Sequence, residues 1–253
     1  MSYAKDVLTA FRIAGCEPVN GDQDRNELRA NASELGVELD DLALERLEQF
    51  ARLVVEGNRV QNLTRIPPGH MNALHFLDSL SLAAAVRPKP GWEAVDVGTG
   101  AGFPGVPLAI AFQETRFALV EATGKRAEFV ARAIGALDLS NARVCHGRAE
   151  DLSKLPAYAR RFDLAVARAV ARLPRLVPWL MPFLKPGACA VAYKSVASDE
   201  ELLAAREALA ASGAALDRAV DVVLPGSGIR RKLVVLRRAG PPISRRISTG
   251  RRS

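Results

Sequence analysis

The sequence predicts an α/β fold: a Rossmann-like, mostly parallel seven-stranded sheet with an antiparallel last strand, plus N-terminal helices. Two observations support this prediction. After the Pro88–Pro90 break, short apolar runs alternate with segments of helical periodicity, which is the pattern of βαβ units with right-handed crossovers. The last two apolar runs are joined only by residues 225–228. That link is too short for a crossover, so these runs must pair as an antiparallel hairpin.

Seven segments in this second part of the chain have the length and the apolar composition of strands. They are 93–97, 116–120, 142–145, 162–167, 188–193, 217–224 and 232–237. Helical periodicity fills the segments 104–112, 124–136, 173–184 and 199–212. No internal repeat or low-complexity segment interrupts this order.

The chain before this sheet has helical rather than strand-like patterning. The expected helices are 3–15, 40–57 and 69–86. Asp40 or Asp41 can cap the second helix, and the polar, turn-rich segment 17–27 is expected to be a surface insertion. The sequence therefore divides into a helical extension packed on the core (1–88), the core itself (89–238) and a basic, flexible tail (239–253).

Composition is that of an ordinary globular protein, with 49% apolar and 25% charged residues. No run approaches the ~20 apolar residues that a membrane span needs, and the N-terminus lacks the layout of a signal peptide. The three cysteines are Cys16, Cys145 and Cys189. They are widely spaced, without a CxxC pair, so we expect reduced thiols, a cytoplasmic protein and no contact with a membrane.

Positive charge is concentrated at the C-terminus. The formal net charge is +7, and residues 229–253 contain nine Lys or Arg and no acidic residue, so the preceding chain is close to neutral. Such a segment suits a polyanion, because each Lys or Arg placed on a phosphate releases counterions. The alternative is a solvated segment that only aids solubility. The sequence leaves both interpretations open.

A glycine-rich turn is the strongest local signal. The apolar strand 93–97 contains Asp96 and leads into Gly98, Gly100 and Gly102. Glycines permit positive φ and close approach of the backbone to a ligand, and the helix that follows offers free N–H groups. Residues 100–105 also form a literal G-x-G-x-x-G, so a dinucleotide site is an alternative, and an unliganded strand–helix turn is another.

Three details favour S-adenosylmethionine as the cofactor over a dinucleotide. Asp96 would repel a pyrophosphate but suits a cofactor with an ammonium and a sulfonium group. Pro104 begins the next helix, which leaves one N–H donor fewer for a diphosphate. Glu121 ends the next strand, 25 residues after Asp96, where a carboxylate can accept both ribose hydroxyls of an adenosine. The predicted fold is therefore that of a class I S-adenosylmethionine-dependent methyltransferase.

Residues at the ends of later strands extend the predicted site. Ala149 and Glu150 follow the third strand, where a backbone N–H or an acidic side chain can contact the adenine, or can simply begin a helix. Arg168 ends the fourth strand, at the edge where open parallel sheets bind ligands. It can hold the cofactor carboxylate or an RNA phosphate, or be a plain sheet-end charge. Lys194, which ends the fifth strand, allows the same interpretations.

Several longer motifs follow one another between about residues 40 and 238. They are QNLTRI (61–66), HFLDSL (75–80), DVGTGAGFPGVPLAI (96–110), LVEATGKRAEFV (119–130), GRAEDL (147–152), FDLAVARAVA (162–171) and PFLKPG (182–187). In this combination the chain resembles the bacterial RsmG family, also called glucose-inhibited division protein B. Gly57, Gln61 and Ala101 depart from the family's usual tryptophan, aromatic residue and proline, and the tail after Gly240 departs from its usual ending.

The resemblance implies both cofactor contacts and an activity. The implied cofactor contacts are Gly98, Phe103, Ala149, Glu150 and Arg168, with Glu121 as the ribose-binding acid. The implied activity is methyl transfer from S-adenosylmethionine to N7 of a guanosine at position 527 of 16S ribosomal RNA. The substrate would be the RNA or the small-subunit particle. Family signatures without a clear role fall on Asn62, His75, Asp78 and Ser79.

Guanine N7 has a free lone pair and can attack the sulfonium methyl group without first losing a proton. A general base is therefore unnecessary, and we assign no catalytic residue. His75, Asp78 and Ser79 lie on one short helical segment and cannot form a hydrolytic triad. Since His70, His75 and His146 lack paired ligands at metal spacing, we expect no metal site.

Two function classes remain as alternatives. A dinucleotide-dependent oxidoreductase has the literal G-x-G-x-x-G in its favour, but the sequence contains no Tyr-x-x-x-Lys pair for hydride transfer. A non-catalytic RNA-binding module would use the basic C-terminus alone. The first would bind NAD, and the second would keep its RNA affinity after loss of the cofactor site without transferring a methyl group.

Overall fold

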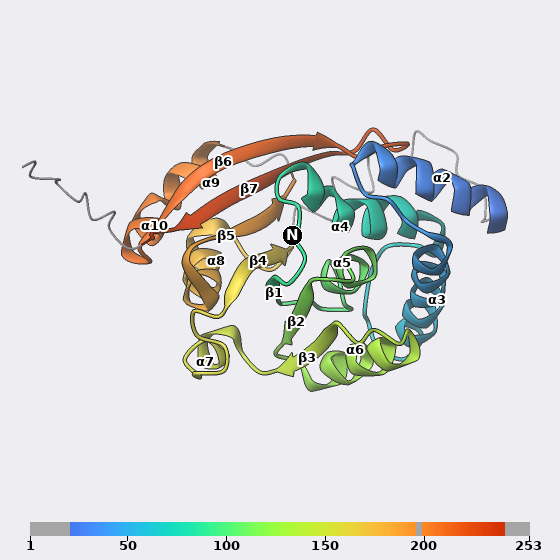
Figure 1. The fold of residues 1–253 in the computed structure, drawn as a ribbon, viewed down its shortest axis with the longest axis horizontal. Coiled ribbons are helices and arrows are strands. Elements are labelled where there is room, and N and C mark those ends of the chain that lie inside the picture. Colours follow the sequence, from blue (N-terminus) through green and yellow to red (C-terminus); the bar gives the residue numbers. More distant parts are fainter. Residues whose placement is uncertain (1–20, 196–198, 241–253) are drawn as a thin grey trace, which may run out of the picture.

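The computed structural model describes residues 21–195 and 199–240, which form a seven-stranded sheet with helices on both faces (Figure 1). The strands are β1 (Glu93–Val97), β2 (Arg116–Glu121), β3 (Ala142–His146), β4 (Phe162–Arg168), β5 (Leu184–Lys194), β6 (Ala214–Val223) and β7 (Arg230–Arg238). Their order in the sheet is β3-β2-β1-β4-β5-β7-β6. The predicted Rossmann-like fold is confirmed.

Strand direction follows the prediction as well. The pairs β3–β2, β2–β1, β1–β4 and β4–β5 are parallel, whereas β7 runs antiparallel to both β5 and β6. The β6–β7 turn closes with a hydrogen bond from the Leu224 N–H to the Ile229 carbonyl, 2.8 Å long. Because β1 to β5 are parallel, their carboxyl ends meet at one edge of the sheet.

The described helical segments connect and cover these strands. The α-helices are α2 (Gly21–Glu34), α3 (Asp41–Asn58), α4 (Asp78–Leu80), α5 (Gly105–Ala111), α6 (Gly124–Ala136), α7 (Ala149–Leu152), α8 (Leu173–Leu180), α9 (Asp199–Ala204) and α10 (Arg206–Ala211). Three short 3₁₀ segments are Pro68–His70, Ser81–Ala84 and Met181–Phe183, and Asn72–Leu77 forms a π-helical turn. The predicted helix 3–15 lies outside the described residues.

Alternate residues of the central strands point to opposite faces of the sheet. In β4, Leu164 and Val166 pack with α3, α5 and α6, whereas Ala165 and Ala167 pack with α7, α8 and α10. Figure 1 shows these two sets of helices on either side of the sheet. The first buried cluster also includes Leu28 of α2, so the N-terminal helices share a core with the sheet.

The start of α3 was predicted correctly. Asp40 precedes the helix with extended backbone, and its side chain accepts a hydrogen bond from the Ala43 N–H at 2.7 Å. This contact satisfies one of the N–H groups that a helix start leaves without a partner.

The prediction of a surface insertion over 17–27 is wrong for residues 21–27, which belong to α2. The segment is polar, but tertiary contacts hold it as a helix. Arg25 donates two hydrogen bonds to the carboxylate of Glu48 on α3, at 2.7 and 2.6 Å. Leu28 and Ala32 are buried on the same helix.

The predicted helix over 69–86 is present as a continuous helical stretch over residues 68–84, but it is not one regular α-helix, because 3₁₀, π and α segments follow one another along it. Side chains bind carbonyl groups in this stretch. Ser79 donates to the His75 carbonyl and Ser81 to the Asp78 carbonyl, each at 2.6 Å. Tyr193 of β5 donates to the Ser79 carbonyl at 2.7 Å. Such contacts compete with regular helix hydrogen bonds.

A substitution of Gly105, at the start of α5, tests how tightly the turn packs on the sheet. A Cβ there would lie 2.1 Å from Leu119 Cδ2 and 2.8 Å from Asp96 Oδ2. We expect Gly105→Ala to lower the free energy of unfolding by about 1–3 kcal/mol, because the core must move to accept the methyl group. Urea titration followed by circular dichroism measures this change.

Gly135→Ala is the matched control. Gly135 lies in α6, and a Cβ added there would meet nothing within 4 Å. Here alanine should raise the free energy of unfolding by about 0.5–1 kcal/mol, because it is the better helix former. Equal effects of the two substitutions would contradict the packing argument.

Candidate functional site

The predicted cofactor residues come together at the carboxyl edge of the sheet. Asp96 and the glycine turn follow β1, Glu121 ends β2 and Arg168 ends β4. Ala149 and Glu150 begin α7, just after β3. Since β3, β2, β1 and β4 are neighbours in this order, residues from four separate segments border one another.

The turn between β1 and α5 is held by its own backbone N–H groups, since those of Gly98 and Thr99 donate to the Val120 carbonyl and that of Gly100 donates to Glu121. Gly98 and Gly100 both have positive φ, at 76° and 62°. A Cβ on Gly100 would meet nothing within 4 Å, whereas one on Gly98 would lie 2.9 Å from Val170 Cγ2. Gly98 is therefore required both by its backbone angle and by its contact with Val170, which follows β4. Gly100 leaves room beside the turn.

Gly102 lies against the buried core. A Cβ there would lie 2.9 Å from Val106 Cγ2 and 3.0 Å from Phe50 Cζ, both of which belong to the buried core. This glycine permits close packing of α3 against the turn. Phe103 is also largely buried, at 5% exposure, and packs against Phe50 with ring centroids 5.0 Å apart.

Asp96 lies beneath the turn and is fully buried. Its Oδ2 accepts a hydrogen bond from the Gly105 N–H at 2.9 Å, so the carboxyl group fixes the start of α5. Burial raises the pKa of Asp96 to about 7, although the nearby Thr99 hydroxyl, the Gly105 N–H and the charge of Arg168 favour the ionised form.

Two polar atoms under the turn have no partner among the described residues. They are Asp96 Oδ1 and Thr99 Oγ1, which are buried without meeting hydrogen-bond geometry. The two side chains are neighbours, because the Thr99 hydroxyl is among the groups that favour the ionised form of Asp96. Since both residues are buried beneath the turn, they act on the turn itself.

Glu121 shapes the turn from the neighbouring strand. Its Oε2 accepts from the Gly100 N–H at 2.9 Å and its Oε1 accepts from the Thr123 N–H at 2.8 Å. The side chain is only 6% exposed. Each carboxylate oxygen can accept a second hydrogen bond. Glu121 therefore retains acceptor capacity for a pair of hydroxyl groups beside Gly100.

Arg168 is fixed by several side chains rather than free at the end of β4. It donates to Asp78 Oδ2 at 2.9 Å, to the Leu74 carbonyl at 3.1 Å and to His75 Nδ1 at 2.9 Å. Its guanidinium also lies 5.3 Å from the ring centroid of Phe103. Two of its five N–H groups, including Nε–H, find no acceptor in the described part of the chain, so one edge can still bind an anion.

His75 is buried between these groups. Its ring stacks on Phe103 with centroids 3.9 Å apart and planes 6° from parallel. Burial lowers the pKa of His75 well below its usual value, and the charge of Arg168 lowers it further. The imidazole is therefore neutral at neutral pH. It is a packing and hydrogen-bonding group and not a charged one.

Lys194 is held by hydrogen bonds within the fold. Its ammonium donates to Glu201 Oε1 at 2.7 Å and to the Ala171 carbonyl at 2.8 Å, and its side chain is 13% exposed. The same Glu201 oxygen accepts from the Leu173 N–H at 2.6 Å. These bonds hold the loop between β4 and α8, which supports the interpretation of Lys194 as a structural charge at the sheet end.

The basic residues from 230 to 238 belong to β7, and most of them are paired inside the fold. Arg231 is 3% exposed and donates to Asp78 Oδ1 at 2.8 Å. Arg237 donates to Asp217 at 2.9 Å, and Arg238 donates to the Met181 and Leu184 carbonyls. The basic tail beyond residue 240 lies outside the described residues.

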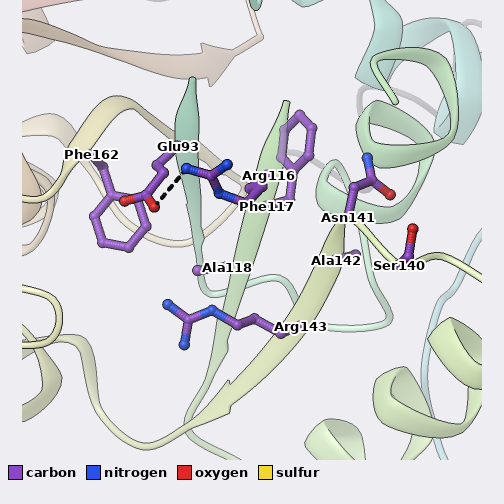
Figure 2. Close-up of a pocket in the computed structure, with 9 residues that line it drawn as sticks. All are labelled: Glu93, Arg116, Phe117, Ala118, Ser140, Asn141, Ala142, Arg143 and Phe162. Carbon is purple, nitrogen blue, oxygen red and sulfur yellow. Dashed lines mark hydrogen bonds and ion pairs between the residues drawn. The ribbon is translucent and has the colours of Figure 1, made fainter. Parts of the chain in front are cut away.

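The opposite edge of the sheet contains a small cavity of about 100 Å³ at the amino ends of β1 to β4 (Figure 2). Two of its polar side chains are paired with neighbouring groups. Glu93 accepts from Arg116 at 3.1 Å, and Asn141 donates to the Ala109, Phe112 and Thr115 carbonyls. This cavity lies away from every predicted site residue.

A known protein family matches most of the sequence that forms this site. The family model described as "GidB: rRNA small subunit methyltransferase G" matches residues 43–231. The chain belongs to this family. A relative from Pelotomaculum thermopropionicum, named ribosomal RNA small subunit methyltransferase G, is 38% identical over 84% of this chain and 90% of its own. One of the same name from a Geobacter species is 40% identical over 83% of this chain and 96% of its own.

Solved structures agree on the fold. A methyltransferase from Aquifex aeolicus, described as SAM dependent, superposes with a TM-score of 0.50 at 18% identity, covering 67% of this chain and 93% of its own. At this identity the likeness concerns the fold alone. No described helix is long and apolar enough to cross a membrane, and the described residues contain no cluster of potential metal ligands.

This GidB family member contains two site residues to which the sequence patterns assigned no role, Thr64 and Arg231. Thr64 Oγ1 lies 2.8 Å from His75 Nε2, a contact between residues that only the fold brings together. Arg231 could have been found from strand periodicity. It shares the buried face of β7 with Leu233 and Val235, two and four residues later.

The raised pKa of Asp96 predicts a pH dependence of stability. The folded protein holds this proton up to about pH 7, whereas the unfolded chain releases it near 3.8. Between these values the folded state binds more protons, so its stability must fall as pH rises. We expect the Asp96 contribution to decrease by about 4 kcal/mol across this range and then to level off.

Asp96→Asn supplies the comparison, because asparagine keeps an acceptor for the Gly105 N–H and does not titrate. Urea unfolding of both proteins between about pH 4 and 8 gives the difference in free energy as a function of pH. We expect the wild-type protein to lose stability relative to the variant as pH rises to about 7. A difference that does not vary with pH would contradict the assignment.

Proposed function

We propose that this protein transfers a methyl group from S-adenosylmethionine to N7 of a guanosine in 16S ribosomal RNA, at position 527 by family resemblance. Membership of a family named for small-subunit ribosomal RNA methyltransferases supports the reaction and the class of substrate. The observation that carries the cofactor is the Gly98–Gly102 turn, with open space at Gly100 and the Glu121 carboxylate beside it.

The residues present fit the cofactor's groups. Glu121 would accept the ribose hydroxyls, because it lies beside Gly100 and retains acceptor capacity. The remaining N–H groups of Arg168 suit a carboxylate. The start of α7 at Ala149, with Glu150 next to it, would contact the adenine. Asp96 acts from beneath the turn, where its ionised form would favour a nearby ammonium group.

When bound, the cofactor supplies an electrophilic methyl group, and guanine N7 supplies the attacking lone pair. No proton must leave N7 first, so the protein's task is to align the two and to exclude water. The described site is consistent with this task. His75, the histidine beside Arg168, is neutral, buried and already bound to Arg168. The target base must leave its stack to reach the carboxyl edge of the sheet.

The location and the remaining RNA contacts belong to the same proposal. A protein that modifies bacterial ribosomal RNA works in the cytoplasm, and no described helix is built to cross a membrane. The four arginines after residue 244 would contact RNA phosphates, since the segment 241–253 contains no acidic residue. The basic residues of β7 are largely paired inside the fold and contribute less.

Glu121→Gln tests the cofactor site. The substitution removes the charge and places an amide N–H₂ against the Gly100 or Thr123 N–H. Loss of charged hydrogen bonds of about 1.5–3 kcal/mol should raise the Kd for S-adenosylmethionine by about 10- to 150-fold. Isothermal titration calorimetry measures the change.

Glu93→Gln is the matched control at the opposite edge of the sheet, where Glu93 contacts Arg116 and Arg161. Its Kd for the cofactor should stay within about twofold of the wild-type value, as expected for a residue remote from the site. Wild-type affinity in Glu121→Gln, or equal losses in both variants, would overturn the site. Titration with NAD tests the competing cofactor.

Methyl transfer itself is tested with radiolabelled S-adenosylmethionine and two substrates, small ribosomal subunits that lack the modification and naked 16S ribosomal RNA. Cleavage specific for N7-methylguanosine then maps the label. We expect a single labelled guanosine at position 527. Label at another guanosine would retain the reaction and refute the target, and absence of label from both substrates would refute the reaction.

A further inference from the structure

A chain of hydrogen bonds connects the predicted cofactor site to a surface loop. Arg168 donates to His75 Nδ1 at 2.9 Å, and His75 Nε2 lies 2.8 Å from Thr64 Oγ1. His75 is 4% exposed and the side chain of Arg168 is 8% exposed. Thr64 is partly exposed, so this series of hydrogen bonds begins inside the protein and ends at its surface.

The direction of each hydrogen bond follows from the donors available. Arginine can only donate, so His75 Nδ1 must be the acceptor and the ring proton must lie on Nε2. Nε2–H therefore donates to Thr64 Oγ1, which also accepts from the Ile66 N–H at 3.1 Å. The acceptor positions of this hydroxyl are then filled. Its own O–H has no acceptor among the described residues.

A free O–H at the end of such a chain is a good donor. Successive hydrogen bonds that point the same way polarise one another, and here they begin at a positively charged guanidinium. The group best suited to the outer end is an acceptor that carries negative charge, such as a phosphate.

The loop that carries Thr64 is suited to a polyanion. Arg59 and Arg65 are exposed on either side of Thr64. Asn58 fixes the loop by accepting from the Leu63 N–H at 2.8 Å and the Thr64 N–H at 3.0 Å. The loop therefore presents two cations and one hydroxyl donor in a defined conformation, which favours contact with a nucleic-acid backbone.

The inner end of this series of hydrogen bonds is rigid. His75 stacks on Phe103, which belongs to the glycine turn, and Arg168 is anchored by Asp78. A change in the hydrogen bonding of Thr64 can reach the guanidinium through the His75 ring, since both nitrogens of that ring are engaged. The side-chain contacts thus join a surface donor to the residue suited to bind the cofactor's carboxylate.

We propose that Thr64 donates a hydrogen bond to a phosphate of the substrate RNA and that the Thr64–His75–Arg168 chain couples this contact to the cofactor site. Thr64 and His75 are positioning residues in this arrangement. The inference rests on the proposed function. It adds an RNA contact and a coupling free energy between the two ligands, which must be reciprocal.

The test measures the coupling directly. The Kd for S-adenosylhomocysteine is determined by equilibrium dialysis with and without saturating small ribosomal subunits that lack the modification. For the wild-type chain we expect binding to be about fivefold tighter, or more, in the presence of subunits. Thr64→Val, which removes the hydroxyl and keeps the shape, should bring the ratio of the two Kd values to about one.

Two further variants separate the effect of the Thr64–His75–Arg168 hydrogen bonds, called the relay below, from general effects of the loop. Thr64→Ser keeps the hydroxyl and should keep the wild-type ratio. Asn58→Ala removes the side chain that fixes the loop but leaves the Thr64–His75 contact, so it should weaken binding to the subunit and retain the ratio. Thermal unfolding of each variant verifies that the chain remains folded.

Each outcome tests either the relay or the proposed function. A wild-type ratio of one, an unchanged ratio in Thr64→Val, or an equal loss in Asn58→Ala overturns the relay while cofactor binding and methyl transfer persist. If S-adenosylhomocysteine fails to bind, or if no subunit is methylated, the proposed function fails first. The dialysis without subunits and the methyl-transfer assay distinguish these cases.

Discussion

The carboxylate of Asp78 is the interaction on which the rest of the carboxyl edge depends. It is fully buried and lies between two guanidinium groups, Arg168 at 2.9 Å and Arg231 at 2.8 Å. An isolated buried charge is very costly, and removal of one partner from such a pair commonly costs about 3–5 kcal/mol. This one carboxylate therefore holds together a segment before the sheet, the end of β4 and the start of β7.

The Asp78 cluster also fixes part of the predicted cofactor site. Arg168 cannot follow a ligand freely, because Asp78, His75 and the Leu74 carbonyl fix three of its N–H groups. The glycine turn is fixed in a similar way by Asp96 from beneath and Glu121 from the side. The Glu121 carboxylate and the remaining N–H groups of Arg168 are thus held in place before a ligand binds, which favours affinity.

The two edges of the sheet differ in what they leave unsatisfied. At the amino edge, the Glu93 carboxylate accepts from Arg116 and the Asn141 amide donates to neighbouring carbonyls around a small cavity. At the carboxyl edge, Glu121 can accept further hydrogen bonds, Arg168 has N–H groups without an acceptor among the described residues, and Thr64 has a hydroxyl proton to donate. Unused hydrogen-bonding capacity is therefore concentrated where a cofactor and an RNA would meet, as expected of a site that is completed by its ligands.

Features that depend on local chemistry could be predicted from the sequence. Apolar alternation located the strands, the short 225–228 link required an antiparallel hairpin, Asp40 marked the start of α3, and the glycines marked the turn. The pairing of charges, in contrast, depends on the folded chain. Arg231 and Lys194 resembled free basic residues, and 69–86 resembled a regular helix, because only the fold shows which groups their side chains meet. A hydrogen bond between distant residues leaves no periodic signal in a single chain, so the fold alone could show that Thr64, His75 and Arg168 form one connected group.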